Sequence, residues 1–300
     1  MKLGYYPGCS LLGSSREYGE SFCAIAPRLG LELQEVPDWN CCGASAAHNL
    51  NRELSLALPA RVLGLAERAG FAEVVAPCSA CYSRLAVANH ELQDETLRRR
   101  ISEIAEVEYR GTVRIVNVLE VLARFASDSL ARKVVEPFKR RVACYYGCYL
   151  VRPPKITKFD RPEDPQSMDE LMKVIGAEPI DWAFKTECCG AGFSVSRTDL
   201  VAKLSGKILN DAVRRGAEAI IVACPMCQVN LDLRRDAITG YLGREHTIPV
   251  LYISQAIGLA LGVDEQSLGL HRHIVPVALS QNTTAEPVPV EPVSSGREDA

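Results

Sequence analysis

Residues 72–85 read AEVVAPCSACYSRL, and residues 217–231 read AEAIIVACPMCQVNL. Each stretch begins with a short apolar run that contains valine or isoleucine, which is typical of a buried strand. A Cys-x-x-Cys motif follows the run, and residues with helical spacing come directly after it. Strands that alternate with helices in this way indicate a parallel sheet, so the fold class predicted for the chain is α/β.

Two further motifs accompany the Cys-x-x-Cys pair, and they occur twice in the same order. YYPGCSL at residues 5–11 is matched by CYYGCYL at residues 144–150, and NCCGAS at residues 40–45 is matched by ECCGAG at residues 187–192. The copies lie roughly 140 residues apart, which is too far for a solenoid repeat. The repetition therefore indicates tandem duplication of a whole domain.

The duplication predicts two pseudo-symmetric domains, each with one Cys-Cys-Gly motif and each a mainly parallel sheet with flanking helices. We expect an N-terminal domain at residues 1–135, a C-terminal domain at residues 136–273, and a flexible tail at residues 274–300 that is rich in proline, valine and serine. Strands are expected at residues 2–6, 31–36, 72–77, 141–146 and 218–223. Helices are expected at residues 15–29, 51–69, 79–105, 167–176, 198–216 and from residue 225 onward.

The composition is that of a globular protein: 47% of the 300 residues are hydrophobic and 24% are charged. A net charge of −3 gives no electrostatic footprint for nucleic acid, and the arginine run at residues 98–100 lies among acidic residues, as on a solvated helix face. The N-terminus does not have the unbroken apolar region of an export signal, and the apolar run at residues 251–263 is too short to span a bilayer. We therefore expect a cytoplasmic protein with no nucleic-acid partner and no direct membrane insertion.

Twelve cysteines in a reducing compartment are more typical of metal ligands or redox groups than of structural disulfides. Ten of them form two copies of one pattern: a Gly-Cys, a Cys-Cys-Gly and a Cys-x-x-Cys. Five thiolates per copy exceed the four that tetrahedral zinc or a cubane cluster takes, and the tight cysteine run of many cubane sites is absent. The donors favour iron–sulfur chemistry, with zinc as the alternative. The two sets are Cys9, Cys41, Cys42, Cys78 and Cys81, and Cys148, Cys188, Cys189, Cys224 and Cys227.

Over residues 1–262 this arrangement resembles the cysteine-rich CCG domain of HdrB, the B-type component of heterodisulfide reductase. The resemblance implies one noncubane 4Fe-4S cluster on each five-cysteine set. It implies that a substrate disulfide is held between the clusters and cleaved to two thiols, or formed in the reverse reaction. It also implies a multisubunit complex, with an HdrC-like iron–sulfur subunit as electron donor and an HdrA-like flavoprotein behind it.

Two other functions stay open at this point. The chain is alternatively a subunit of a bacterial Hdr-like complex that oxidises thiol-bound sulfur, or an electron-relay CCG subunit of a hydroxyacid dehydrogenase or quinone-linked complex. A complete cysteine set in both copies disfavours the pure relay, since a relay needs no paired sites that face a substrate.

Four residues outside the two sets carry separate expectations. His48, six residues after Cys42, is a weak catalytic candidate that would donate a proton to a departing thiolate. We expect Cys23 and Cys144 to be buried as small hydrophobic residues. Lys185, close to the second Cys-Cys-Gly motif, is expected to be a solvated surface charge.

Overall fold

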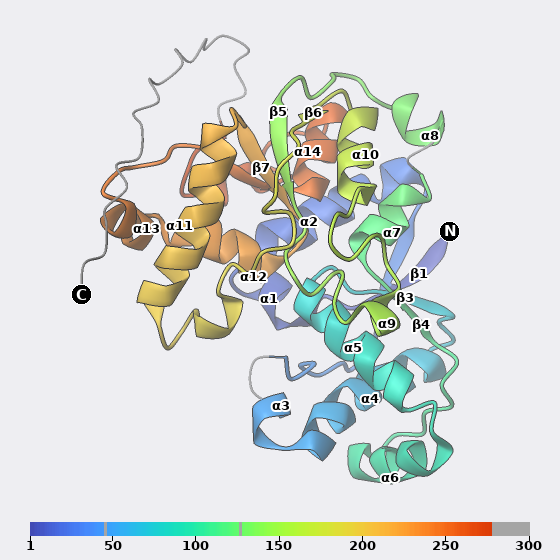
Figure 1. Ribbon diagram of the computed structural model, residues 1–300. Coiled ribbons are helices and arrows are strands. Elements are labelled where there is room, and N and C mark those ends of the chain that lie inside the picture. The colour runs from blue at the N-terminus through green and yellow to red at the C-terminus, as the bar shows by residue number, and fades with distance from the viewer. Residues whose placement is uncertain (45–46, 126–127, 278–300) are drawn as a thin grey trace, which may run out of the picture.

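The computed structural model describes residues 1–44, 47–125 and 128–277, and within them the chain forms two four-stranded parallel sheets. Helices flank both sheets, and Figure 1 shows the first-half helices α3 to α6 below and the second-half helices α10 and α11 above. The predicted α/β class with two related lobes is confirmed.

The first sheet consists of β1 (Lys2–Tyr5), β2 (Glu32–Glu35), β3 (Glu73–Val75) and β4 (Arg114–Val116), in the order β2-β1-β3-β4. Its pairings are parallel, and β1 and β3 are the two central strands. Parallel strands end at the same edge of a sheet, so Cys9 after β1 and Cys78 after β3 are brought together there. The Tyr6 amide extends this contact beyond the strands by donating to the Val75 carbonyl at 3.0 Å.

The second sheet consists of β5 (Arg141–Tyr145), β6 (Glu178–Pro179), β7 (Ala219–Val222) and β8 (Val250–Tyr252), in the order β6-β5-β7-β8. The strands follow one another along this sheet in the same sequence as in the first, which agrees with a duplicated domain. The central pair is again the strand before the Gly-Cys motif and the strand before the Cys-x-x-Cys motif. The exact domain boundaries, at residues 135 and 273, stay predictions.

Each of the three helical ranges predicted for the first lobe contains a helix, but two ranges differ from the prediction, and four short helices were not predicted. The helix expected at residues 15–29 ends at Ile25 and is followed by the 3-10 helix Pro27–Leu29. The single helix expected at residues 79–105 is two helices, because the Asp94 side chain accepts a hydrogen bond from the Leu97 amide at 2.8 Å and starts a new helix there. The α-helices of this lobe are α1 (Gly8–Leu12), α2 (Arg16–Ile25), α3 (Ala47–Leu50), α4 (Arg52–Arg68), α5 (Ser79–Glu91), α6 (Glu95–Ala105), α7 (Val118–Ala123) and α8 (Asp128–Ala131).

The second lobe contains a π-helical turn, Val229–Leu233, directly after the second Cys-x-x-Cys motif. Such turns are rare and occur frequently at functional sites. The α-helices of this lobe are α9 (Pro154–Thr157), α10 (Ser167–Val174), α11 (Thr198–Arg214), α12 (Pro225–Gln228), α13 (Arg235–Leu242) and α14 (Ile253–Ala260).

The two lobes share one continuous apolar core. Helix α2 of the first lobe packs against α14 of the second, and there the Tyr18 and Tyr252 rings stack with centroids 4.2 Å apart. The buried Ser21 and Ser254 hydroxyls lie 2.7 Å apart at the same interface. The relative placement of the lobes is therefore set by buried contacts.

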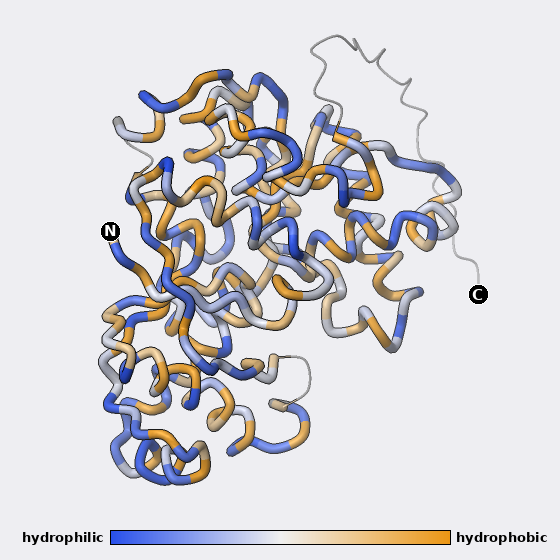
Figure 2. The backbone as a smooth tube through the Cα atoms, turned by 180° about the vertical axis from the view of Figure 1, so that it is seen from behind, coloured by the Kyte–Doolittle hydropathy of each residue, from blue (hydrophilic) through white to orange (hydrophobic). Residues whose placement is uncertain are grey.

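Hydrophobic and hydrophilic segments alternate along the chain, as Figure 2 shows. The helices that face the core are amphipathic: α11, for instance, buries Val201, Ile208 and Leu209 and exposes charged residues between them. In the part of the chain that the structure describes, no helix is both long enough and apolar enough to cross a membrane.

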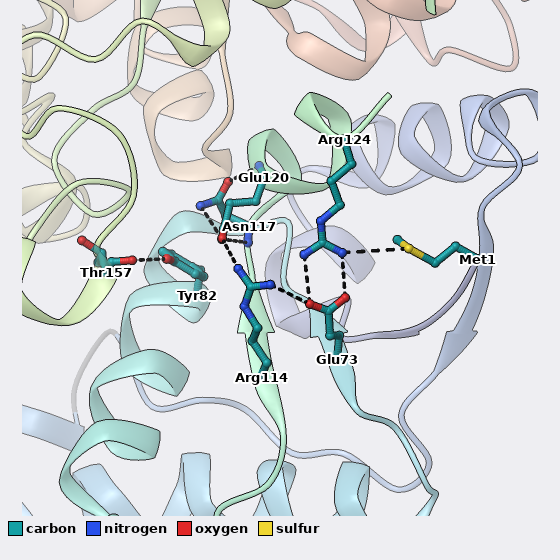
Figure 3. Close-up of polar contacts among 8 residues, drawn as sticks. All are labelled: Met1, Glu73, Tyr82, Arg114, Asn117, Glu120, Arg124 and Thr157. Carbon is teal, nitrogen blue, oxygen red and sulfur yellow. Dashed lines mark hydrogen bonds and ion pairs between the residues drawn. The ribbon is translucent and has the colours of Figure 1, made fainter. Parts of the chain in front are cut away.

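A network of charged residues closes the outer edge of the first sheet (Figure 3). Glu73 pairs with Arg124 at 2.7 Å and with Arg114 at 2.9 Å, and Arg114 also reaches Glu120. Glu120 completes a capping box with Asn117 at the start of α7. Because these residues come from β3, β4 and the α7 segment, the network holds β4 in place beside β3.

Candidate metal centre

We call Cys9, Cys41, Cys42, Cys78 and Cys81 the first cysteine cluster. Its five thiols are neighbours in the structure. The Cys42 and Cys81 Sγ atoms are 3.2 Å apart. The Cys41 sulfur interacts with the thiols of Cys42 and Cys9, and the Gly43 amide donates a hydrogen bond to it at 3.4 Å. Cys78 is the N-cap residue of α5 and interacts with Cys81.

Hydrogen bonds shift the pKa values of the thiols in this cluster in opposite directions. Hydrogen bonds from the Cys42 and Cys9 thiols lower the pKa of Cys41 to about 2, and the Gly43 amide acts in the same direction. The hydrogen bond between Cys42 and Cys41 raises the pKa of Cys42 to about 12. The hydrogen bond between Cys9 and Cys41 likewise raises the pKa of Cys9. The thiolate is the form of cysteine that binds a metal.

We call Cys148, Cys188, Cys189, Cys224 and Cys227 the second cysteine cluster, and its sulfurs are arranged in the same way. Cys148 donates to Cys188, and with the Gly190 amide at 3.3 Å this lowers the pKa of Cys188 to about 6. Cys224 caps α12, and its hydrogen bond from Cys227 lowers its pKa to about 7. Cys227 also contacts Cys189. All ten cysteines predicted as ligands therefore gather into the two predicted sets.

Each cluster has an open side and a buried side. Cys9, Cys41 and Cys188 are exposed and Cys148 is partly exposed. The Cys-x-x-Cys cysteines and the second residue of each vicinal pair, Cys42 and Cys189, are buried. A ligand from solvent can therefore reach each cluster at its Gly-Cys and at the first cysteine of its vicinal pair.

A glycine before the lone cysteine keeps the backbone close to the sulfurs in both lobes. Gly8 has φ +65° and Gly147 has φ +67°, a conformation that favours glycine. A Cβ at Gly8 would lie 3.1 Å from the Cys81 sulfur, and one at Gly147 would lie 2.9 Å from the Cys227 sulfur. Any larger residue would displace a cluster sulfur.

The donors fit an iron–sulfur group in kind and in number. Soft thiolates select iron–sulfur clusters, copper(I) or zinc, and five sulfurs per lobe can hold more than one iron. Among the described residues, no group of three or more Cys, His, Asp or Glu side chains is placed to hold a metal ion. Instead, each sulfur interacts with one or two neighbouring sulfurs of its own cluster.

The segments that carry the two Cys-x-x-Cys motifs meet at the lobe interface. The Ser79 hydroxyl, next to Cys78, donates to the Ala223 carbonyl, next to Cys224, at 2.8 Å. The Tyr18 hydroxyl approaches the same carbonyl at 3.4 Å. The Cys-x-x-Cys segments of the two lobes are thus in direct contact.

Two of the expectations for residues outside the clusters were wrong. Cys23 is exposed, because it lies on the outer face of α2, although its thiol interacts with the Tyr5 hydroxyl. Lys185 is buried, and its ammonium group pairs with Asp169 at 3.1 Å and with Asp164 at 3.2 Å. Cys144 is fully buried, as expected. The side chain of His48 lies outside the described residues, so its candidate role stays a prediction.

Sequence reasoning missed two polar residues beside the second cluster. Asn230, in the π-helical turn, donates to the Cys189 sulfur, and Asp169 holds Lys185 and the Tyr146 hydroxyl. No local pattern indicates the role of Asn230, because its partner Cys189 lies 41 residues earlier in the chain.

Comparison with known proteins gives one family and a consistent set of relatives. The model of the CCG cysteine-rich domain matches residues 3–86 and again residues 142–232. The chain is 32% identical to the 8-methylmenaquinol:fumarate reductase membrane anchor subunit of Wolinella succinogenes, over 91% of this chain and 97% of that protein. It is 31% identical to the B subunit of the ferredoxin:CoB-CoM heterodisulfide reductase of Methanosarcina mazei, over 91% of this chain and 94% of that protein.

Among solved structures, a hypothetical protein from Helicobacter pylori superposes with a TM-score of 0.76 at 15% sequence identity. The superposition covers 92% of this chain and 52% of that longer chain. At this identity the likeness concerns the fold alone, and it agrees with the two-sheet architecture described above.

Proposed function

Because the chain belongs to the CCG cysteine-rich domain family, which includes heterodisulfide reductase B subunits, we propose that it is the disulfide-cleaving subunit of a cytoplasmic heterodisulfide reductase-like complex. One observation carries the proposal: both lobes contain a complete five-cysteine cluster, and the segments that carry their Cys-x-x-Cys motifs are in contact. Two sites of the same kind suit a substrate that presents two sulfur atoms.

In this proposal the first cysteine cluster and the second cysteine cluster each hold one 4Fe-4S cluster, noncubane by resemblance to the family. When bound, these groups supply one-electron transfer and a binding position for sulfur. The protein contributes the thiolates, the Gly43 and Gly190 amides that donate to Cys41 and Cys188, and the glycines that bring the backbone close. The open side of each cluster, at Cys9 and Cys148, is where a substrate sulfur would approach.

The proposed reaction breaks one S–S bond and needs two electrons and two protons, which yield two thiols. The reverse reaction oxidises two thiols to a disulfide and releases the same electrons and protons. We propose that an HdrC-like iron–sulfur subunit delivers the electrons and that an HdrA-like flavoprotein supplies that subunit. Within this chain the burial of the Cys-x-x-Cys cysteines excludes water from the side of each site that faces the other lobe.

A second candidate function is electron relay to or from a quinone. The observation that favours it is the similarity to a subunit of a menaquinol:fumarate reductase from Wolinella succinogenes, which spans 97% of that protein. In this case the same ten cysteines would hold the same clusters, and no disulfide would bind between them.

The two functions differ in what the reduced, anaerobically purified complex turns over. Disulfide cleavage predicts two thiols per disulfide consumed, from small or protein-borne disulfides, and loss of this activity in Cys188→Ala. The matched control Cys23→Ala removes an exposed cysteine outside both clusters and should keep full activity. Failure to reduce any disulfide, together with rapid reduction of a menaquinone analogue, would establish the relay instead.

A further inference from the structure

Asn230 is a buried amide that contacts a sulfur of the second cysteine cluster. It lies in the π-helical turn Val229–Leu233 and is fully buried. Its Nδ2 atom is 3.2 Å from the Cys189 carbonyl oxygen and 3.5 Å from the Cys189 sulfur. The Ser194 hydroxyl lies 2.9 Å from its Oδ1 atom. The side chain is thus held at both ends.

The chemistry of these neighbours fixes which end of the amide faces the sulfur. The Cys189 carbonyl can only accept a hydrogen bond, so the NH₂ group of Asn230 must point toward it. The reversed amide would set two oxygens against each other in a buried site. One N–H of Asn230 therefore serves the Cys189 carbonyl, and the other is directed at the Cys189 sulfur.

This donor belongs to the second lobe alone in the part of the chain described. The equivalent position in the first lobe, three residues after the Cys-x-x-Cys motif, is Arg84. No described side chain other than cysteine donates to a sulfur of the first cluster. Ser79 approaches Cys224 but has a single proton, which it donates to the Ala223 carbonyl. Asn230 is therefore the side-chain amide that distinguishes the two sites.

We propose that Asn230 is a positioning residue that raises the reduction potential of the iron–sulfur cluster on the second cysteine cluster. This inference rests on the proposed function, because it requires a cluster to be bound there. A hydrogen bond to a ligand sulfur stabilises the more negative, reduced state over the oxidised state. An electron shared between the two sites is therefore held preferentially by the cluster of the second lobe, which has the higher reduction potential.

The test is an anaerobic redox titration of the complete complex, followed by electron paramagnetic resonance. Asn230→Leu removes the donor and keeps a similar volume. We expect the reduction potential of the second site to fall, because the equilibrium constant shifts about tenfold toward the oxidised state, which is 59 mV for a one-electron couple. The reduction potential of the first site should not change. The second-site signal is identified as the one that Cys188→Ala removes.

A matched control separates this role from general loosening of the structure. The buried Ser205 hydroxyl donates to the same Cys189 carbonyl at 3.0 Å but makes no bond to the sulfur, so Ser205→Ala should leave both potentials in place. If Asn230→Leu does not assemble, Asn230→Asp keeps the size, and its carboxylate should shift the second potential in the same direction. An unmoved second potential, or an equal shift in Ser205→Ala, would overturn the inference. Absence of iron from the wild-type protein would instead overturn the proposed function.

Discussion

The ion pair between Lys185 and Asp169 is buried, and its loss should lower the stability of the chain. Only 5% of the Lys185 side chain and 6% of the Asp169 side chain are exposed. Asp169 also accepts a hydrogen bond from the buried Tyr146 hydroxyl at 2.6 Å. The Lys185 carbonyl accepts from the Tyr146 and Gly147 amides, directly before Cys148. The pair therefore holds the segment that leads to the second cluster.

Lys185→Met should destabilise the chain strongly, because it leaves the Asp169 carboxylate buried without its cation. Removing one partner of a buried pair costs about 3–5 kcal/mol, whereas replacing both partners is far less costly. The double variant Lys185→Met with Asp169→Asn should therefore recover most of the loss. The amide oxygen introduced by the second substitution can still accept the hydrogen bond from the Tyr146 hydroxyl.

Anaerobic urea unfolding, followed by circular dichroism, measures these differences as shifts of the midpoint at constant slope. The exposed pair of Arg197 and Asp199 provides the control, since Arg197→Met should leave the midpoint almost unchanged. The reasoning is refuted if Lys185→Met costs less than about 1 kcal/mol, the range of an exposed pair. It is refuted equally if the double variant is no more stable than the single one.

Three further predictions concern the interface, the glycine and the edge network. Ser79→Ala should cost about 1 kcal/mol of stability by removing the hydrogen bond between the lobes, and equal midpoints in urea would contradict this. Gly147→Ala should alter the absorption and paramagnetic spectra of the second site alone, since its Cβ meets the Cys227 sulfur; unchanged spectra would count against the geometry. The hydrogen bond from Arg124 lowers the pKa of Glu73 in the folded state. The ionised Glu73 side chain therefore stabilises the fold fully above its unfolded-state pKa near 4.5, and this stabilisation is lost as the pH falls through the lower folded-state pKa. The difference in unfolding free energy between wild type and Glu73→Gln, about 1 kcal/mol at pH 7, should therefore vanish in acid, and a constant difference from pH 7 to pH 3 would contradict the assignment.

The central strands and the cysteine sets could be predicted because their signals are local and occur twice. The apolar run before Cys78 and the one before Cys224 each specify a strand, and the turn to a helix follows within a few residues. The edge strands β4, β6 and β8 were missed because strands of two or three residues carry too little pattern to recognise. The break at Asp94 was missed because the helical spacing continues on both sides of it.

The polar surroundings of the second cluster could not be predicted from the sequence, since they depend on contacts between distant residues. Lys185 is buried because α10 presents Asp169 to it from sixteen positions earlier in the chain. Asn230 reaches Cys189 across an even longer separation. Neither residue stands in a periodic pattern that indicates its partner, so each looked like an ordinary polar residue until the fold brought the segments together.

The metal content of the anaerobically purified chain tests the central claim most directly. Two iron–sulfur clusters predict about eight irons per chain, four for each five-cysteine set. Cys188→Ala should reduce the content to about four irons, and Cys23→Ala should leave it unchanged. Zinc in place of iron, or an iron content that Cys188→Ala does not lower, would contradict the account.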